Sequence, residues 1–148
     1  MRVSVGGTVL YVDVEGAQLR VAGDRLVERP TVVVLHGGPG FDQGYLRPGL
    51  APLAEHARLV FVDLRAQGRS ERVPVRSCTP ERMADDVAEL CDVLGLDAPF
   101  VLGHSAGGFV ALQLALRHPR TPGGLILCST TPTLAPLHDP DPPAGSCR

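Results

Sequence analysis

Four short apolar runs constrain the fold of this chain more than any other feature of its sequence. They cover Thr31–Leu35, Leu59–Val62, Phe100–Leu102 and Leu125–Leu127. A run without polar alternation is typical of a strand that is buried on both faces of a parallel sheet. Helical patterns lie between the runs, so strand and helix alternate along the chain. This order predicts an α/β fold, with a mostly parallel sheet, flanking helices and right-handed crossovers.

Three helices are expected between these runs. The clearest begins at Thr79-Pro80-Glu81, an N-cap residue followed by a proline and an acid, and it ends at Gly95. A second apolar helix covers Ala106–Arg117. A weaker helical pattern, interrupted by two prolines, covers Tyr45–His56. These helices would cover the sheet.

The two ends of the chain differ from this pattern. At the start, Val3–Val5 and Thr8–Val14 predict a hairpin around Gly6-Gly7, and Gln18–Ala22 predicts a further short strand. Residues 132–148 are rich in proline and lack periodicity, which indicates disorder. We therefore expect one domain over residues 1–131, followed by a disordered tail.

The pentapeptide Gly103-His104-Ser105-Ala106-Gly107 carries the strongest chemical signal. It matches G-x-S-x-G between a predicted strand and a predicted helix, the context in which a serine forms a nucleophile elbow. Small residues two positions before and after Ser105 allow strand and helix to pack closely around the sharp turn. The hydroxyl of Ser105 then lies at a helix N-terminus, where the N–H of Ala106 can donate to an oxyanion.

A second motif, His36-Gly37-Gly38-Pro39-Gly40, directly follows the Thr31–Leu35 run. With both motifs the sequence resembles the α/β-hydrolase superfamily, and this pentapeptide is similar to that of its proline iminopeptidase-like branch. The resemblance implies part of an α/β-hydrolase core, in which Gly38 gives the second oxyanion-hole N–H. It also implies supporting roles for His36, Gly37, Gly40 and His104. The elbow departs from the Gly-Gly-Ser-Trp-Gly of that branch, so a generic esterase or carbon–carbon bond hydrolase fits it as well.

A third segment, Asp63–Ser70, resembles the D-x-R-G-x-G-x-S loop of the family, with Ala66 where glycine is usual. We expect its carboxylate, guanidinium and hydroxyl to fix a turn beside the site.

A dinucleotide-binding loop is the rival interpretation of the glycines after His36, but Gln43 stands where G-x-G-x-x-G needs its last glycine. The chain has no lysine, which excludes a Walker A loop and Schiff-base chemistry. No cofactor and no metal are expected.

The acid and the base of a serine triad are not evident. In this family they follow the serine along the chain, and the histidines after Ser105 are His118, at a helix end, and His138, in the proline-rich tail. We therefore expect the front part of a longer hydrolase, whose Ser105 acyl-enzyme chemistry on an ester, amide or peptide bond is impaired. The alternatives are an inactive truncated product and a non-catalytic ligand-binding or interaction protein on a hydrolase scaffold.

Composition narrows the expected partners. A formal net charge of −2 gives no reason to expect nucleic acid or an anionic membrane. No signal peptide is evident, and four widely spaced cysteines predict free thiols in the cytoplasm. We expect a small-molecule or peptide substrate. The edge of a sheet that ends at Leu125–Leu127 also predicts self-association.

Overall fold

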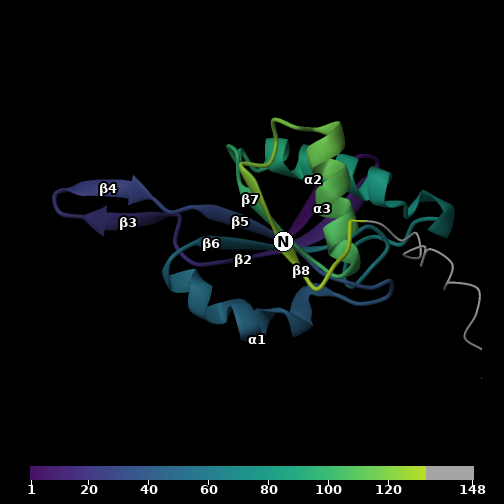
Figure 1. Cartoon of the computed structure of the whole chain (residues 1–148), viewed down its shortest axis with the longest axis horizontal. Helices are drawn as coiled ribbons and strands as arrows, with labels where there is room; N and C mark the ends of the chain where they lie inside the picture. The colour runs from purple at the N-terminus through teal and green to yellow at the C-terminus, as the bar shows by residue number, and fades with distance from the viewer. Residues whose placement is uncertain (133–148) are drawn as a thin grey trace, which may run out of the picture.

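The computed structural model describes residues 1–132, and its main feature is a six-stranded sheet in the order β1-β2-β6-β5-β7-β8 (Figure 1). The strands are β1 (Arg2–Val5), β2 (Thr8–Glu15), β5 (Thr31–Leu35), β6 (Arg58–Asp63), β7 (Phe100–His104) and β8 (Gly124–Cys128). Strands β6, β5, β7 and β8 run parallel, whereas β1 and β2 pair antiparallel. The predicted α/β fold with a mostly parallel sheet is confirmed, and each of the four apolar runs lies within a parallel strand.

Helices cover both faces of this sheet. Helices α2 (Pro80–Val93) and α3 (Ala106–Arg117) lie on one face, and α1 (Arg47–Leu50) lies on the other (Figure 1). Thr79 caps α2 as predicted, because its side chain accepts a hydrogen bond from the N–H of Arg82. A short 3-10 turn, Val75–Ser77, precedes α2.

The single helix predicted over residues 45–56 is wrong. The segment is divided into a 3-10 helix at Gln43–Tyr45, then α1, then a second 3-10 helix at Ala51–Glu55. Pro48 and Pro52 each lie in the first turn of a separate short helix. Proline lacks the N–H that a helix interior needs, so each proline starts a new segment instead of continuing the previous one.

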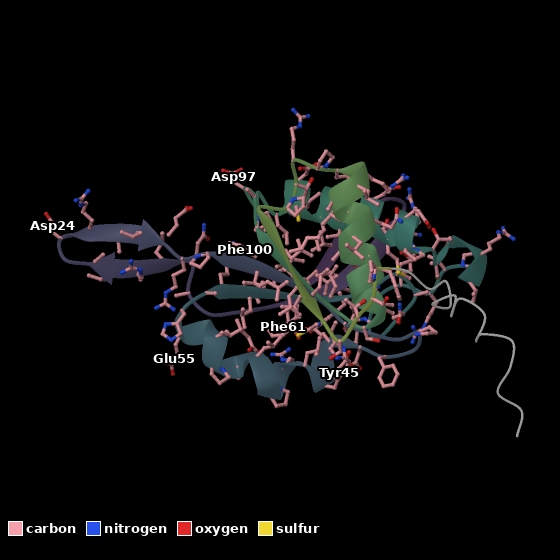
Figure 2. All side chains as sticks on the ribbon, viewed as in Figure 1. Asp24, Tyr45, Glu55, Phe61, Asp97 and Phe100 are labelled. Atoms are coloured by element: carbon pink, nitrogen blue, oxygen red, sulfur yellow. The ribbon has the colours of Figure 1, made fainter. Side chains whose placement is uncertain are left out.

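The core consists of one apolar layer on each face of the sheet. The larger layer joins the sheet to α2 and α3, with Val33, Val87 and Leu114 among its buried members. The smaller one lies on the α1 face, around the fully buried ring of Phe61 (Figure 2). Both faces of the central strands β5, β6 and β7 are therefore covered, which is why their sequences show continuous apolar runs.

The first residues form two hairpins with different surroundings. The predicted β1–β2 hairpin is present and joins the main sheet through β6. The predicted short strand is β3 (Leu19–Ala22), and it pairs with β4 (Arg25–Glu28), which the sequence pattern did not indicate. This β3–β4 hairpin forms a separate two-stranded sheet that projects from the molecule, with Asp24 at its tip (Figure 2).

Strand β8 forms the far edge of the described sheet and pairs there with β7. Within residues 1–132 no further strand pairs with it, and the side chains of Ile126 and Leu127 are exposed. Self-association through this edge stays a prediction. No helix within residues 1–132 has the length and apolarity that crossing a bilayer requires. The predicted disordered tail lies outside the described residues.

Candidate active site

Ser105 lies at the sharp turn between β7 and α3. Its backbone angles, φ 52° and ψ −119°, belong to a region that side-chain-bearing residues rarely adopt. It is the N-cap residue of α3, and its N–H donates to the carbonyl of Cys128 at the end of β8, 2.9 Å away. The predicted strand–Ser–helix arrangement is therefore present.

Close packing around this turn explains the glycines of the motif. A Cβ atom at Gly103 would lie 2.6 Å from the carbonyl oxygen of Gly107, and one at Gly107 would lie 2.4 Å from the carbonyl oxygen of Leu35. At Gly108 a Cβ would overlap the side chain of Thr130. Backbone atoms cannot move aside as a flexible side chain can, so β7, α3 and the end of β5 can approach one another only without these Cβ atoms.

The His36–Gly40 loop lies against the elbow because β5 and β7 are neighbours in the sheet. Leu35 is the register partner of Gly103, so the two strands end at the same edge. A Cβ at Gly37 would lie 3.0 Å from the Cβ of Ser105. The structure thus brings together the two motifs that are 66 positions apart in the sequence, from Gly37 to Gly103.

Two backbone N–H groups beside Ser105 have no partner within residues 1–132. They belong to Gly38 and to Ala106, the two positions predicted to form an oxyanion hole. The N–H of Gly37, in contrast, donates to the hydroxyl of Tyr45 at 2.8 Å, and that of Gly40 donates to Oε1 of Gln67 at 3.1 Å. The loop therefore uses its flanking donors to hold its shape and keeps the N–H of Gly38 free.

His36 is fully buried, and both of its ring nitrogens are occupied. Nε2 accepts a hydrogen bond from the N–H of Leu64, so Nδ1 carries the proton of the neutral ring and donates to the carbonyl of Gly37 at 2.5 Å. Burial lowers the pKa of His36 below its ordinary value, which favours this neutral form. His36 thus links the end of β5 to the loop after β6, and it is not available as a base for Ser105.

Tyr45 was not among the residues that the sequence predicted for the site. Its hydroxyl accepts the Gly37 N–H and is also hydrogen-bonded to Nδ1 of His104, 2.8 Å away. The ring of Tyr45 meets that of His104 edge-on, with 5.5 Å between the centroids. Tyr45 is the last residue of the 3-10 helix that precedes α1, and Figure 2 labels it beside the helical turns on that face of the sheet. His104 therefore faces Tyr45, and the pair joins the elbow to the His36–Gly40 loop.

The Asp63–Ser70 loop is fixed by internal hydrogen bonds, as expected. The buried Asp63 carboxylate accepts the N–H groups of Gln43 and Arg69, at 3.0 and 2.8 Å. The hydroxyl of Ser70 donates to the carbonyl of Asp63 at 2.5 Å.

The guanidinium of Arg65 points in another direction and fixes the loop to α2. It forms two hydrogen bonds of 2.6 Å with the carboxylate of Asp86, and both side chains are buried. A third hydrogen bond reaches the carbonyl of Gly6 in the β1–β2 turn. Arg65 is therefore held by a buried ion pair away from the elbow.

The hydroxyl of Ser105 has no hydrogen-bonding partner within residues 1–132. This part of the chain therefore supplies no triad acid or base bonded to Ser105. The Asp–His pair in this part of the chain, Asp85 with His118, lies at the far end of α3. His118, which the sequence places at a helix end, is bonded to Asp85, and Asp85 also pairs with Arg117. His138 lies outside the described residues.

Residues 1–132 hold no group of three potential metal ligands.

Comparison with known proteins agrees with these motifs. The family described as "alpha/beta hydrolase fold" matches residues 30–146. A protein of Caulobacter sp. (strain K31) named "Putative carbamate hydrolase RutD" is 39% identical over 106 residues, which are 72% of this chain and 39% of that protein.

Two solved structures share the fold described above. A proline iminopeptidase-related protein of Thermus thermophilus gives a TM-score of 0.76 at 35% identity, over 88% of this chain and 44% of that one. A thermophilic esterase of Thermogutta terrifontis gives 0.75 at 31% identity, over 88% and 46%. The chain spans less than half the length of each of these three relatives, and their names describe different substrates.

Proposed function

This chain belongs to the α/β-hydrolase family, and on that premise we propose that it acts as a serine hydrolase on an ester, amide or related acyl bond. Ser105 is the proposed nucleophile, and the N–H groups of Gly38 and Ala106 are the proposed oxyanion hole. The observation that carries the proposal is the position of Ser105: a strained residue at a helix N-terminus, in contact with the loop that holds a free N–H.

The proposed reaction has two steps, acylation of Ser105 and hydrolysis of the acyl-enzyme. The Ser105 oxygen attacks the carbonyl carbon, a new C–O bond forms, and the negative oxygen of the intermediate accepts the N–H groups of Gly38 and Ala106. The bond to the leaving group then breaks, and the leaving group takes the proton that Ser105 gave up. Water cleaves the acyl-enzyme and releases a carboxylic acid. The supporting roles proposed for His36, Gly37, Gly40 and His104 consist of holding the two donors in place.

A base beside Ser105 would speed the first step, and residues 1–132 do not supply one. Without a base the serine hydroxyl is a weak nucleophile at neutral pH. An oxyanion hole and substrate binding alone still give a rate roughly 10³–10⁴-fold above that of water. We therefore expect slow but site-specific acylation of Ser105 when the leaving group is good.

The test is covalent labelling, either acylation by p-nitrophenyl acetate or phosphonylation by a fluorophosphonate, followed by peptide mass spectrometry. One adduct is expected on Ser105, and it should be absent in Ser105→Ala. Ser129→Ala is the matched control, because Ser129 is exposed and also has a positive φ of 48° but does not begin a helix. Adducts that persist in Ser105→Ala, or a wild-type chain that forms none, would contradict the proposal and favour a non-catalytic role.

A further inference from the structure

A pocket of about 380 Å³ opens beside the two free N–H groups. One end of it is formed by Gly38 and Ala106, the proposed oxyanion donors. Its walls come from the loop after β6, the first turns of α2 and the first turns of α3. The side chains used below are Leu64, Cys78, Met83 and Phe109. A group attached to a carbonyl carbon at Ser105 could enter this space while its carbonyl oxygen faces the donors.

The lining of this pocket is almost entirely apolar. The polar side chains that reach it are His36 and Gln67. Both nitrogens of His36 are occupied, and Oε1 of Gln67 accepts the N–H of Gly40. A charged substrate group would lose its hydration here without gaining an ionic partner, whereas an apolar group would gain from leaving water.

A second hollow, of about 540 Å³, is also lined by Gln67 but has a more polar lining. Arg69, Arg72 and Asp42 line it, together with Tyr45. No Asp, Glu or Arg lines the first pocket, so the two hollows differ in charge. An apolar substituent of a substrate is better matched to the first hollow than to the second.

We propose that the pocket beside Gly38 and Ala106, named here the acyl pocket, binds the short apolar acyl chain of the substrate. The proposal rests on the proposed function and specifies it: the substrates are esters or amides of short apolar carboxylic acids. Met83 from α2 and Phe109 from α3 line this pocket, and they are the side chains that limit the chain length in this proposal. The volume lies at the lower end of the roughly 300–1,000 Å³ typical of ligand sites, which favours a chain of moderate length.

Binding can be measured without any reaction, in Ser105→Ala. The chain has two methionines, so protein labelled with ¹³C at the methionine methyl groups gives two NMR signals. Met83 lines the acyl pocket, whereas Met1 is exposed at the start of β1 and serves as the internal reference. Hexanamide should shift the Met83 signal in a saturable way and leave Met1 unchanged, and acetamide should require at least about tenfold higher concentration.

Two variants locate the effect. Cys78→Phe should fill the acyl pocket and abolish the Met83 shift, while Val75→Phe, at a position 86% exposed that does not line the pocket, should retain it. Should Cys78→Phe fail to fold by circular dichroism, Phe109→Ala tests the part of the lining that α3 provides. Enlarging the pocket there should make decanamide bind more tightly than hexanamide, in contrast to the parent protein.

The acylation rates of Ser105 separate this proposal from the general one. We expect p-nitrophenyl hexanoate to acylate Ser105 about tenfold faster than the acetate, and Cys78→Phe to remove that preference. Equal rates for the two esters, with an unmoved Met83 signal, would overturn the acyl pocket while the serine hydrolase stands. Binding of hexanamide with no acylation of Ser105 would overturn the hydrolase and leave an apolar binding site.

Discussion

The β7–α3 elbow and the Asp63–Ser70 loop leave strands on either side of β5 at the same edge of the sheet, yet they use their polar groups in opposite ways. In the loop, Asp63, Arg65 and Ser70 are all hydrogen-bonded, and all three are buried. At the elbow, the Ser105 hydroxyl and the Ala106 N–H have no partner within residues 1–132. Close packing at the glycines and hydrogen bonds of neighbouring groups, such as the Ser105 N–H to Cys128, hold the elbow, and they leave these two groups for a ligand.

The largest expected effect concerns the loop. Arg65→Met would remove the buried partner of Asp86 and leave its carboxylate only the partly exposed Arg82, 3.7 Å away, so we expect the free energy of unfolding to fall by about 3 kcal/mol. Urea denaturation measures the change. The double variant Arg65→Met/Asp86→Leu removes both charges and should recover most of the loss. A loss below about 1 kcal/mol in the single variant would show that the ion pair does not hold the loop, in contrast to what is expected of a buried pair.

A smaller loss is expected at the elbow. Gly107→Ala places a Cβ 2.4 Å from the carbonyl oxygen of Leu35, so strand and helix must separate. We expect about 2–3 kcal/mol lower stability, typical of overpacking. Gly49→Ala is the control, because Gly49 lies in α1 with open space around its Cβ position. Equal stabilities of the two variants would show that the elbow is not held by close packing.

The pair between α2 and α3 tests how exposure weakens an ion pair. Hydrogen bonds from Arg117 and His118 lower the pKa of Asp85 from 3.8 to about 2. The folded pKa lies below the unfolded one, so the stabilisation is present above pH 4 and is lost as the pH falls from 4 to 2. Because Arg117 is exposed, the contribution should be only on the order of 1 kcal/mol. Urea titrations of wild type and Asp85→Asn should therefore differ at pH 6 and converge near pH 2; a constant difference would contradict the prediction.

The smallest effect has the opposite sign. Ser105→Gly removes the Cβ at φ 52°, where glycine is permitted. Relief of backbone strain exceeds the entropy that glycine adds to the unfolded chain, so we expect a gain of about 0.5–1 kcal/mol together with complete loss of acylation. Ser105→Ala keeps the Cβ and should leave stability unchanged. Destabilisation by Ser105→Gly would show that the serine side chain has a structural role. It would also contradict the expected backbone strain at Ser105.

The sequence predicted those features that depend on short local patterns. The continuous apolar runs identify the central parallel strands because both faces of β5, β6 and β7 are covered, and Thr79-Pro80 locates the start of α2. Features that depend on tertiary contacts were missed. Tyr45 reaches Gly37 and His104 only after the prolines divide the 43–55 segment. Strand β4 has no buried face, so its residues carry no signal of alternation.

The two motifs are far apart in the sequence, and the sheet brings them together. This topology also explains which features of the site could be predicted. That Gly37 and Ser105 meet follows from parallel strands β5 and β7 ending at one edge, once both are recognised as strands. The direction of each hydrogen bond does not follow from the pattern. Nothing in the sequence indicates that Gly37 donates to Tyr45 while Gly38 stays free, because the difference depends on a side chain from a separate helical turn.

The β3–β4 hairpin has a practical consequence for handling the molecule. It directly precedes Thr31 at the amino end of β5, whereas the elbow and the His36–Gly40 loop lie beyond the carboxyl end. Its tip residue Asp24 is exposed and lies far from the buried Phe61 of the sheet (Figure 2). A dye or a surface tether attached at Asp24 therefore presents the edge that carries Ser105 outward, so that immobilised protein and protein in solution offer the same open face to a reagent.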